Sequence, residues 1–575
     1  MSENSTSKNN DLYDAIVIGS GISGGWAAKE LCENELKTLV LERGRMVKHI
    51  EDYPTMNMDP WDFENRGVKT KEIKERKAKQ DRTGYVVNPP TEHFFVDDID
   101  HPYSETKRFD WIRGYHVGGR SITWGRHCYR WSAMDFEANK KDGHGVDWPI
   151  RYKDIAPWYD KVEEYIGIQG ENMDLPQLPN GKYSKPFGLN CVEDHFKQKI
   201  SETFDDRIIG HARTAHITGE AEHEGRTKCQ LRNRCMRGCP FGGYFSSLSS
   251  TLPAAERTGN MVLRPNSIVH EIIYDDKTKL ATGVKVIDAN TKEETIYSAK
   301  IIFCCASAIP STAILLQSKS KRFPNGLGND SGEIGHNLMD HHFHVGAGAD
   351  APEGFEDKYF KGRKPGGFYI PRFVNLGDGK SDKSDYVRGF GYQGGASRQG
   401  WWRSVAELSY GAKMKEELLK PGKWTIGMTA FGECLPYHEN KITLDYDNLD
   451  QWGLPTVNFD CEFKGNEAKM RKDMKNEAVV MLEAAGFKNV NSWEGTSYPG
   501  NAIHEMGTAR MGRDPETSVL NAHNQIHTVK NVYVTDGACM TSSACQNPSL
   551  TYMALTARAV AHAVQQLKEN KFNNA

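Results

Sequence analysis

Apolar positions near the start of the chain fall into two short runs separated by a glycine-rich turn. Ala15 to Ile18 is continuously apolar, which is typical of a buried strand. A helix-compatible segment, Gly25 to Asn34, follows the turn, and a second apolar run, Leu39 to Leu41, comes after it. This pattern predicts a strand, a tight turn, a helix and a second strand.

The glycines of the turn stand at positions 19, 21 and 24, with the spacing G-x-G-x-x-G. Gly19 permits a tight turn, Gly21 lets a pyrophosphate approach the backbone, and Gly24 lets the helix pack closely on the strand. The start of the helix offers free N–H groups and a partial positive charge to phosphates. Glu42, after the second run, can accept hydrogen bonds from an adenosine ribose. The unit favours a dinucleotide site over a purely structural turn, but it does not distinguish FAD from NAD.

Later segments extend this sheet and then change in character. Val284 to Ile287 and Ile301 to Cys305 are strand-like, and Val532 to Gly537 returns as a strand and turn near the C-terminus. From about 346 to 495 the chain instead shows short alternating strands and an amphipathic helix at 466–485. We therefore expect an α/β fold, α+β overall, with a Rossmann-like domain and a second, mostly antiparallel-sheet domain.

Composition narrows the range of functions. The 575 residues carry a net charge of −3, which gives no support for nucleic-acid binding or for a polybasic membrane surface. No apolar run approaches the roughly 20 residues that span a bilayer. The polar start, Met1 to Asn10, lacks an apolar signal region and taken alone predicts a cytoplasmic chain. The basic run from Lys69 to Lys79 is expected to be a solvated insertion.

Three separated segments together resemble the glucose–methanol–choline (GMC) flavin oxidoreductases. They are the unit from Gly19 to Glu42, the segment from Val117 to Gly125, and the stretch from His504 to Gly512 with Asn547 and Pro548. The loop and helix at 306–317 and the stretch 335–340 are also similar to this family, and the matches span almost the whole chain in order. The resemblance implies that the dinucleotide is FAD.

The resemblance also suggests how the chain is divided. The Rossmann-like FAD-binding domain would be built from residues 1–155, 200–345 and 500–575, with a cysteine-bearing loop at 226–245. Residues 156–199 would form a lobe joined to the substrate domain, and residues 346–499 would form the substrate-binding domain itself. That domain shows no recognisable sugar-binding code. Three aromatic residues are candidates for sugar stacking, although packing between lobes is the favoured interpretation: Tyr392, Trp401 and Trp402.

His504 and Asn547 match the catalytic pair of the family. Alcohol oxidation removes a hydroxyl proton and a hydride from one carbon, and histidine is suited to take the proton near neutral pH. The resemblance implies that His504 abstracts this proton, that the hydride passes to flavin N5, and that Asn547 hydrogen-bonds the substrate oxygen. Asn547 is also predicted to cap the last long helix, with Pro548 at its first position.

Further cofactor contacts are expected from two other segments. Thr123 stands where some family members attach FAD through a histidine, so FAD is expected to be non-covalent, with His127 a less suitable attachment point. Asp536 and Gly537 are expected near the ribityl and phosphate groups. The cofactor-binding residues that the resemblance implies are Gly19, Gly21, Gly24, Glu42, Gly118, Gly119, Ser121, Thr123, Asp536, Gly537, Asn547 and Pro548.

Three of the twelve cysteines cluster as Cys229, Cys235 and Cys239, with a proline after the last. Structural zinc would require a fourth ligand, which His223 could supply, and usually has shorter spacings. A disulfide would leave one thiol over. Three thiolates and a terminal Cys-Pro suit a three-iron, four-sulfur (3Fe-4S) cluster, and the spacing matches cluster-bearing bacterial sugar dehydrogenases of the GMC family. The other nine cysteines are expected to be free buried thiols.

Among cluster-bearing relatives, the sequence looks most similar to glucoside 3-dehydrogenase catalytic subunits, which oxidise the C3 hydroxyl of glucosides and disaccharides to 3-keto sugars. The resemblance implies a dehydrogenase whose electrons leave through the cluster to a c-type cytochrome. It also implies a periplasmic location, reached with a small subunit that bears the export signal. The alternatives are a gluconate or polyol dehydrogenase of the same architecture, an oxygen-using oxidase, and a flavin-binding module without catalysis.

Overall fold

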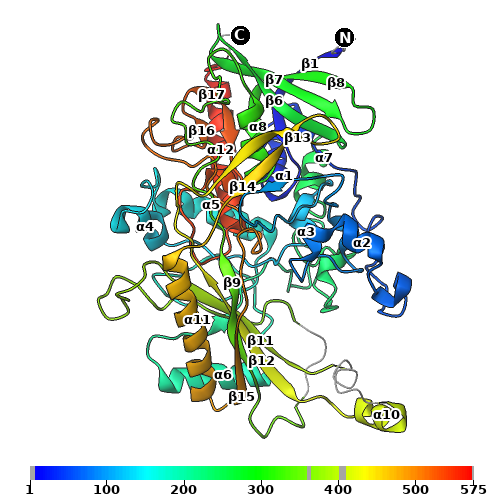
Figure 1. Cartoon of the computed structure of the whole chain (residues 1–575), viewed down its shortest axis with the longest axis vertical. Coiled ribbons are helices and arrows are strands. Elements are labelled where there is room, and N and C mark those ends of the chain that lie inside the picture. The colour runs from blue at the N-terminus through cyan, green and yellow to red at the C-terminus, as the bar shows by residue number, and fades with distance from the viewer. Residues whose placement is uncertain (1–6, 359–363, 401–409, 573–575) are drawn as a thin grey trace.

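A computed structural model of the chain describes residues 7–358, 364–400 and 410–572. The molecule is elongated. A large sheet and its helices form the upper half of Figure 1, and a second sheet with helix α11 (Gly465–Ala484) forms the lower half. The N-terminal strand and the C-terminal helix both belong to the upper half, so that half contains both ends of the chain.

The large sheet has eight strands, and its main path runs β16-β17-β8-β1-β2-β5. β1 (Ser7–Ile18) lies in its interior and pairs in parallel with β2 (Thr38–Leu41) and β8 (Glu294–Cys304). Ile18 lies opposite both Leu41 and Cys304, so the three strands end together. The other strands are β5 (Met261–Arg264), β6 (Ser267–Asp275), β7 (Leu280–Asp288), β16 (Gln525–Ile526) and β17 (Val529–Val534).

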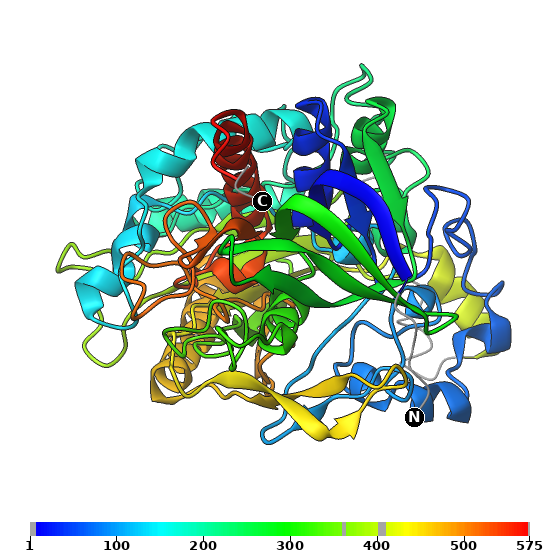
Figure 2. The same cartoon turned by 90° about the horizontal axis from the view of Figure 1, so that it is seen from above.

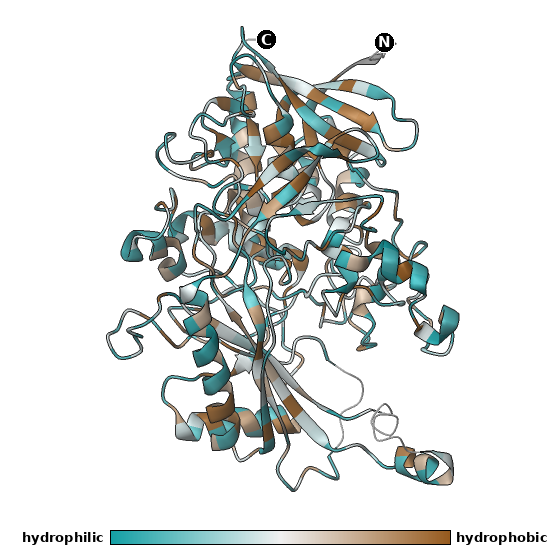
Figure 3. Ribbon diagram, in the orientation of Figure 1, coloured by the Kyte–Doolittle hydropathy of each residue, from teal (hydrophilic) through white to brown (hydrophobic). Residues whose placement is uncertain are grey.

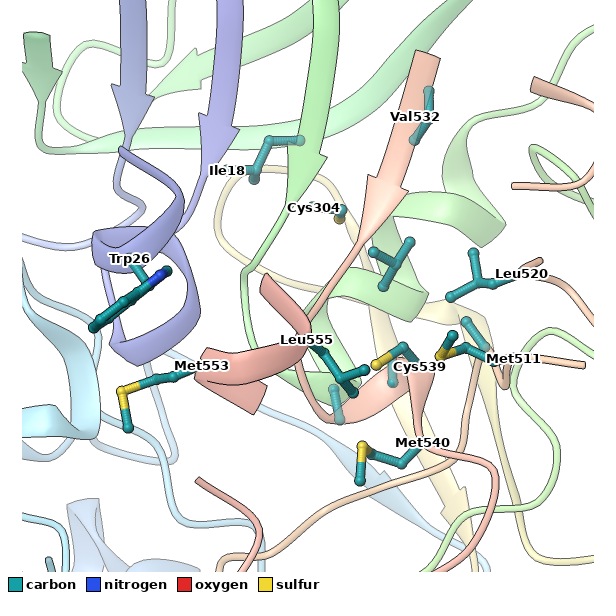
Figure 4. Close-up of a cluster of buried hydrophobic side chains, with 14 of the residues drawn as sticks. Ile18, Trp26, Cys304, Met511, Leu520, Val532, Cys539, Met540, Met553 and Leu555 are labelled. Atoms are coloured by element: carbon teal, nitrogen blue, oxygen red, sulfur yellow. The ribbon is translucent and has the colours of Figure 1, made fainter. Parts of the chain in front are cut away.

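Apolar side chains cover both faces of the central strands. Ala15 and Val17 belong to a core shared with α1 (Ile22–Glu33) and α12 (Ser549–Lys568), two helices that pack side by side in the view from above (Figure 2). The alternate residues, Ile16 and Ile18, enter a second core, part of which is drawn in Figure 4 with Cys304, Val532 and Leu555. The predicted buried strand is therefore covered on both faces, as in parallel sheets flanked by other elements.

Two predicted helices start at different residues from those expected. α1 begins at Ile22, not at Gly25, and α12 begins at Ser549 with Pro548 as its N-cap. The prediction that Asn547 caps α12 is therefore wrong. The backbone of Pro548 is already near-helical (φ −85°, ψ −12°), and the Asn547 side chain bonds to other side chains. The amphipathic helix expected at 466–485 is confirmed as α11.

The lower half contains six antiparallel strands in the order β15-β9-β12-β11-β10-β4, which confirms the predicted antiparallel sheet. α11 packs against β9 and β15, and α6 (Cys191–Thr203) packs against α11. Hydrophilic residues lie along much of α11 in Figure 3, while its methionines are buried against the sheet. The strands are β4 (Gly210–His211), β9 (His342–Asp350), β10 (Phe368–Ile370), β11 (Phe390–Arg398), β12 (Trp424–Gly432) and β15 (Lys488–Glu494).

A third sheet joins the hairpin of β13 (Lys441–Leu449) and β14 (Pro455–Asp460) to β3 (Ser104–Glu105). This hairpin contacts α8 (Ala308–Gln317) of the upper half (Figure 1).

In the described part of the chain, no helix has both the length and the apolar character to cross a membrane. Among the described residues, the remaining helices are η1 (Glu64–Gly67), α2 (Lys71–Arg76), α3 (Ala78–Asp81), η2 (Glu92–Phe94), η3 (Gly119–Ile122), α4 (Ala133–Asp142), α5 (Tyr152–Ile166), η4 (Cys235–Arg237), α7 (Thr251–Arg257), α10 (Gly411–Leu419) and η5 (Gly537–Cys539).

Candidate active site

A cavity of about 940 Å³ opens where β1, β2 and β8 end together. Ile18, Leu41 and Cys305, at or just beyond the three strand ends, form part of its wall. Residues 502–505 and 536–537 from the C-terminal part of the chain also line it. Ligands of parallel α/β sheets bind at this carboxyl edge, so the cavity is the candidate cofactor site.

The glycine turn forms part of the cavity wall. Gly19 has a φ of +95°, and a Cβ added there would lie 2.6 Å from the backbone oxygen of Cys305. A Cβ on Gly24 would lie 1.9 Å from the carbonyl oxygen of Gly19, whereas one on Gly21 would meet no atom within 4 Å. The fold itself therefore requires Gly19 and Gly24. Gly21 faces open space, as expected where a pyrophosphate approaches the backbone.

Glu42 follows β2, and its buried carboxylate is held by the same turn. Oε2 accepts hydrogen bonds from Ser20 Oγ (2.6 Å) and from the Ser20 N–H (3.1 Å), and Oε1 accepts one from the Gly44 N–H (3.0 Å). Burial raises the pKa of Glu42, and these hydrogen bonds oppose the rise. A carboxylate offers about four acceptor positions, so one remains for a ribose hydroxyl in the cavity that Glu42 lines.

The segment 117–125 crosses the cavity wall through η3. The N–H of Gly118 donates to Ser20 Oγ at 3.0 Å and so joins this segment to the glycine turn. The Ser121 hydroxyl accepts from Ser247 Oγ at 3.0 Å and donates to the carbonyl of Gly118, so it braces the backbone. Of the predicted cofactor-binding residues, all of which are described, most line the cavity, and the three that do not are Gly24, Gly118 and Pro548.

His504 and Asn547 come together in the same wall. Asn547 Nδ2 donates to His504 Nε2 at 3.3 Å. On the other side of the imidazole, His504 Nδ1 lies 2.8 Å from Nδ1 of His341. Gln393 Nε2, on β11 of the lower half, donates to Asn547 Oδ1 at 2.6 Å. The structure thus places the two predicted catalytic residues in one hydrogen-bonded group that both halves of the molecule supply.

The surroundings of His504 favour its neutral form. Burial lowers the pKa of His504 well below its ordinary value, and the nearby side chains of His341, Arg120 and His127 lower it further. Burial also lowers the pKa of His341 to about 4. A neutral imidazole keeps a lone pair at neutral pH and can therefore accept a proton.

Two carboxylates hold the segment that carries His504. Asp340 accepts hydrogen bonds from the N–H groups of His504 (3.0 Å) and Ala502 (3.1 Å). Its pKa is raised to about 7, chiefly by burial and then by the nearby Glu505 carboxylate. Arg120 donates to both oxygens of Glu505, at 3.0 and 2.9 Å. This bidentate geometry leaves neither charge unpaired beside the site.

Sequence reasoning missed much of the remaining wall. Tyr85, Phe343 and Phe431 line the cavity, and the rings of Phe343 and Phe431 stack with centroids 5.4 Å apart. The basic run 69–79 is largely solvent-facing around α2, but Tyr85 and His101, which follow it, form part of the wall. His341 directly follows the motif 335–340, which is the one signal in the sequence that could have indicated it.

Of the aromatic residues suggested for sugar stacking, Tyr392 is among the described residues and does not line the cavity. Tyr392 is fully buried in the core of the lower half, where its hydroxyl donates to the carbonyl oxygen of Met474 at 2.6 Å. It therefore cannot stack on a substrate. Trp401 and Trp402 lie outside the described residues.

The cysteine loop lies directly beside the cavity. η4, which begins at Cys235, packs against η3, and Met236 forms part of the cavity wall. Arg234 forms an ion pair with Asp59, which ties the loop to the segment before α2. Near the end of the loop, the Tyr244 hydroxyl donates to the carbonyl oxygen of Ile122 at 2.6 Å. Loop and cavity wall are thus joined both by packing and by hydrogen bonds.

The three thiols of this loop influence one another. Burial raises the pKa of Cys229 to about 11, and the nearby Cys235 and Cys239 add to the rise. Within the described residues, no group of three or more His, Cys, Asp or Glu side chains is arranged to hold a metal ion. His223 bonds through Nε2 to the carbonyl oxygen of Tyr165 at 2.9 Å, which gives no support to the zinc alternative.

All twelve cysteines lie in the described part of the chain, and all are free thiols. Of the nine outside the loop, eight are buried and Cys191 is half-buried. The expectation of free thiols is therefore confirmed, and that of burial fails only for Cys191.

Comparison with known proteins decides the family. Family models described as GMC oxidoreductase match residues 13–343 and 436–556. The chain belongs to the GMC oxidoreductase family. This GMC oxidoreductase is 25% identical to the fructose dehydrogenase large subunit of Gluconobacter japonicus, over 97% of this chain and 98% of that protein. It is 28% identical to 2-methyl-1,2-propanediol dehydrogenase of Mycolicibacterium austroafricanum, over 96% of this chain and 94% of that protein.

The fold comparison agrees with this assignment. A solved structure of formate oxidase from Aspergillus oryzae matches the GMC oxidoreductase with a TM-score of 0.61 and 14% identity, over 98% of this chain and 100% of that one. The predicted fold class and family are thereby confirmed.

GMC oxidoreductases bind FAD, and the cavity fits this cofactor. Gly21 faces open space beside the start of α1, and Glu42 keeps an acceptor position free for the ribose. His504 and Asn547 line the same cavity. The protein is accordingly a flavoprotein oxidoreductase that acts on CH–OH donors.

Proposed function

We propose that this protein is an FAD-dependent sugar dehydrogenase that oxidises a secondary hydroxyl, the C3 hydroxyl of a glucoside or disaccharide, to a ketone. The observation that carries the proposal is His504, whose pKa burial holds well below its ordinary value, with the Asn547 amide 3.3 Å away, in a cavity that also holds the glycine turn and Glu42. A histidine and asparagine pair alone is compatible with a structural role. Its position in the cofactor cavity favours a chemical one.

The residues of the pair would divide the work on the substrate. His504 Nε2 would take the hydroxyl proton as general base, and Asn547 Nδ2 would donate a hydrogen bond to the same oxygen. Negative charge that develops on this oxygen would then face two donors in an enclosed site. Bound FAD would supply the oxidising chemistry by accepting a hydride from the substrate carbon.

The cavity wall near His504 suits a hydroxylated ring. His504 and Asn547 supply polar groups, and Phe343 and Phe431 supply flat apolar surfaces. A sugar presents both hydroxyl groups and C–H faces and could use both kinds of contact. Two relatives are named as dehydrogenases of fructose and of a propanediol, which supports a polyhydroxylated substrate. The choice of C3 rests on the sequence resemblance.

We also propose that Cys229, Cys235 and Cys239 hold a 3Fe-4S cluster through which electrons leave. Three observations support this: Cys235 and Cys239 lie near enough to raise the pKa of Cys229, the three thiols share one loop, and Met236 of that loop lines the cavity. Guanidinium groups on the same loop would offset the negative charge of a cluster. Protein purified without oxygen should contain stoichiometric iron and sulfide, which Cys235→Ser should lose and Cys191→Ser should keep. Wild-type protein without iron would exclude the cluster.

Electron exit would require further proteins. The match to a protein named as a large subunit supports assembly with another chain. We propose a small subunit that carries the export signal, a c-type cytochrome as acceptor, and a periplasmic location. Fractionation of the native cells, with mass spectrometry of the chains that co-purify, tests all three. Recovery of the protein alone in the cytoplasmic fraction would refute them.

Dye reduction by the FAD-loaded protein tests the activity itself. Trehalose, sucrose, D-glucose, gluconate and glycerol would be offered with dichlorophenolindophenol, and the products would be examined by NMR. A 3-keto product from the disaccharides is expected. Reduction by gluconate or glycerol alone would favour the alternative dehydrogenases, and hydrogen peroxide without dye would favour an oxidase. No reduction by any of the five would overturn the proposal.

A further inference from the structure

We propose that His341 and Gln393 are positioning residues that fix the direction of the hydrogen bonds through the His504–Asn547 pair, and so hold His504 in the tautomer that takes a proton at Nε2. This inference rests on the proposed function, because it assigns roles within the same site. His341 lies behind the cavity wall and acts through His504. Gln393 lines the wall and acts through Asn547.

A backbone carbonyl sets the direction of the first of these hydrogen bonds. His341 Nε2 bonds to the carbonyl oxygen of Ala544, which can only accept, so Nε2 of His341 carries a proton. Burial lowers the pKa of His341 to about 4, so at neutral pH the ring has a single N–H group. Its Nδ1 must therefore accept, and His504 Nδ1, 2.8 Å away, must donate.

His504 then carries its lone pair on Nε2. Its own pKa lies well below the ordinary value, so it too has one proton, and the bond to His341 places that proton on Nδ1. Asn547 Nδ2 can only donate, and it points at Nε2 of His504 from 3.3 Å, which agrees with this assignment. When Nε2 takes a proton, Nδ1 still donates to His341, so the hydrogen bond between the two imidazoles is kept during the transfer.

Gln393 closes the chain at the other end. The Asn547 amide could in principle be turned to exchange its oxygen and nitrogen. Its Oδ1 would then face the lone pair of His504 Nε2, so two acceptors would oppose each other. In the orientation found, Oδ1 instead receives Gln393 Nε2 at 2.6 Å. Gln393 sits in β11, between β10 and β12, and pairs with Tyr369 and Thr429, so the lower sheet fixes its position.

Substitution at 393 separates donor chemistry from packing. Gln393→Glu presents only acceptors to Asn547, so it should turn the Asn547 amide and set Oδ1 against His504 Nε2. Gln393→Met keeps a similar length without any donor or acceptor and leaves the amide where His504 prefers it. We expect Gln393→Glu to slow cofactor reduction by about 100-fold, within the range for losing a general base, and Gln393→Met to slow it by less than about tenfold.

His341 offers a matched pair of its own. Gln at 341 can donate to the Ala544 carbonyl and accept from His504 Nδ1, whereas Phe can do neither. His341→Phe should slow reduction at least tenfold, and His341→Gln should restore most of the rate. The pH dependence of the reduction rate provides a second readout, because misfolding would lower the rate without shifting the pH at which it falls. The groups facing His504 are His341, Arg120, His127 and the Asp340 carboxylate, and only His341 is altered.

Loss of the hydrogen-bond acceptor at position 341 should therefore shift the acid limb of the pH profile, which is the pH range in which the reduction rate falls as His504 becomes protonated. The other groups still lower the pKa of His504, and in the wild-type protein that limb should lie below pH 6.5. Both substitutions remove an imidazole that depresses this pKa, but only His341→Gln keeps an acceptor for the Nδ1 proton, which stabilises the charged ring. The acid limb of His341→Phe should therefore lie at lower pH than that of His341→Gln, which should also show a near-normal plateau rate.

Anaerobic stopped-flow reduction of the FAD-loaded variants decides the matter, with whichever of trehalose, sucrose and D-glucose reduces the wild type fastest. If none reduces it, the proposed function falls and this inference falls with it. If the wild type is reduced, equal rates in Gln393→Glu and Gln393→Met overturn the positioning role and leave the function standing. If His341→Phe does not retain FAD, the comparison of Gln393→Glu with Gln393→Met still tests the positioning role.

A crystal structure of Gln393→Glu with FAD gives a second readout that needs no turnover. The distance between Asn547 and His504 should lengthen beyond hydrogen-bond range, or the Asn547 nitrogen should bond to the new carboxylate. An Asn547 amide that keeps its Nδ2 bond to His504 Nε2 would contradict the inference.

Discussion

Two glycines of the turn after β1 should respond in opposite ways to the same substitution. Gly21→Ala adds a methyl group that meets no atom within 4 Å, at a φ of −71° that alanine readily adopts. Gly24→Ala adds the same group 1.9 Å from the carbonyl oxygen of Gly19, about 1.5 Å inside the ordinary contact distance of 3.4 Å. The first change places its methyl in the cofactor cavity, and the second forces α1 away from the turn.

The expected magnitudes follow from these contacts. Gly21→Ala should leave the apoprotein unchanged or stabilise it by about 0.4–1 kcal/mol, because the unfolded chain loses freedom. It should weaken FAD binding by about 10- to 100-fold, or about 1.4–2.8 kcal/mol, since the methyl occupies the space beside the pyrophosphate. Gly24→Ala should lower the free energy of unfolding of the apoprotein by about 3 kcal/mol or more, because backbone must move.

Titration of each apoprotein with FAD, followed by flavin fluorescence, measures the affinity, and thermal unfolding with and without FAD measures stability. Wild-type FAD affinity in Gly21→Ala would show that the pyrophosphate does not pass this turn. Wild-type stability in Gly24→Ala would show that the helix and strand do not pack as described.

Three other substitutions test separate parts of the structure. Burial raises the pKa of Asp340 to about 7, above its value in the unfolded chain, so the free energy of unfolding should fall as pH rises from about 4 to about 7. Urea unfolding over this pH range should show a smaller fall in Asp340→Asn than in the wild type. An equal fall in both proteins would refute the burial argument. Tyr392→Phe should lower the free energy of unfolding by about 1 kcal/mol without changing the KM for sugar, because only the bond to Met474 is lost, and a raised KM would place Tyr392 at the substrate. Glu505→Gln leaves Arg120 without its charge partner, so chemical denaturation should show a loss of about 3 kcal/mol; an unchanged midpoint would mean that the pair contributes little.

The cofactor end of the site could be predicted from sequence because its requirements are local. Gly19, Gly24 and Glu42 belong to one strand–turn–helix–strand unit, in which each position has a steric or hydrogen-bonding reason readable within about 25 residues. The helix at 466–485 was found for a similar reason, since its periodicity is continuous along the sequence.

The reacting end could be predicted only in part. The family resemblance identifies His504 and Asn547, but the sequence also predicts a helix cap at Asn547, because asparagine before proline is a common N-cap. Its side chain is used instead by His504 and Gln393, and Gln393 is separated from it by 154 residues. Such a contact depends on how the two sheets meet. No pattern in the sequence around Gln393 indicates its contact with Asn547.

Anaerobic mixing of FAD-loaded protein with a glucoside tests most directly that His504 takes the substrate proton in an alcohol dehydrogenase site. The wild-type FAD should be reduced, and His504→Ala should keep its yellow FAD and its melting temperature while the reduction rate constant falls by about 10²- to 10⁴-fold. Equal rates in the two proteins, with FAD bound in both, would show that His504 is not the base.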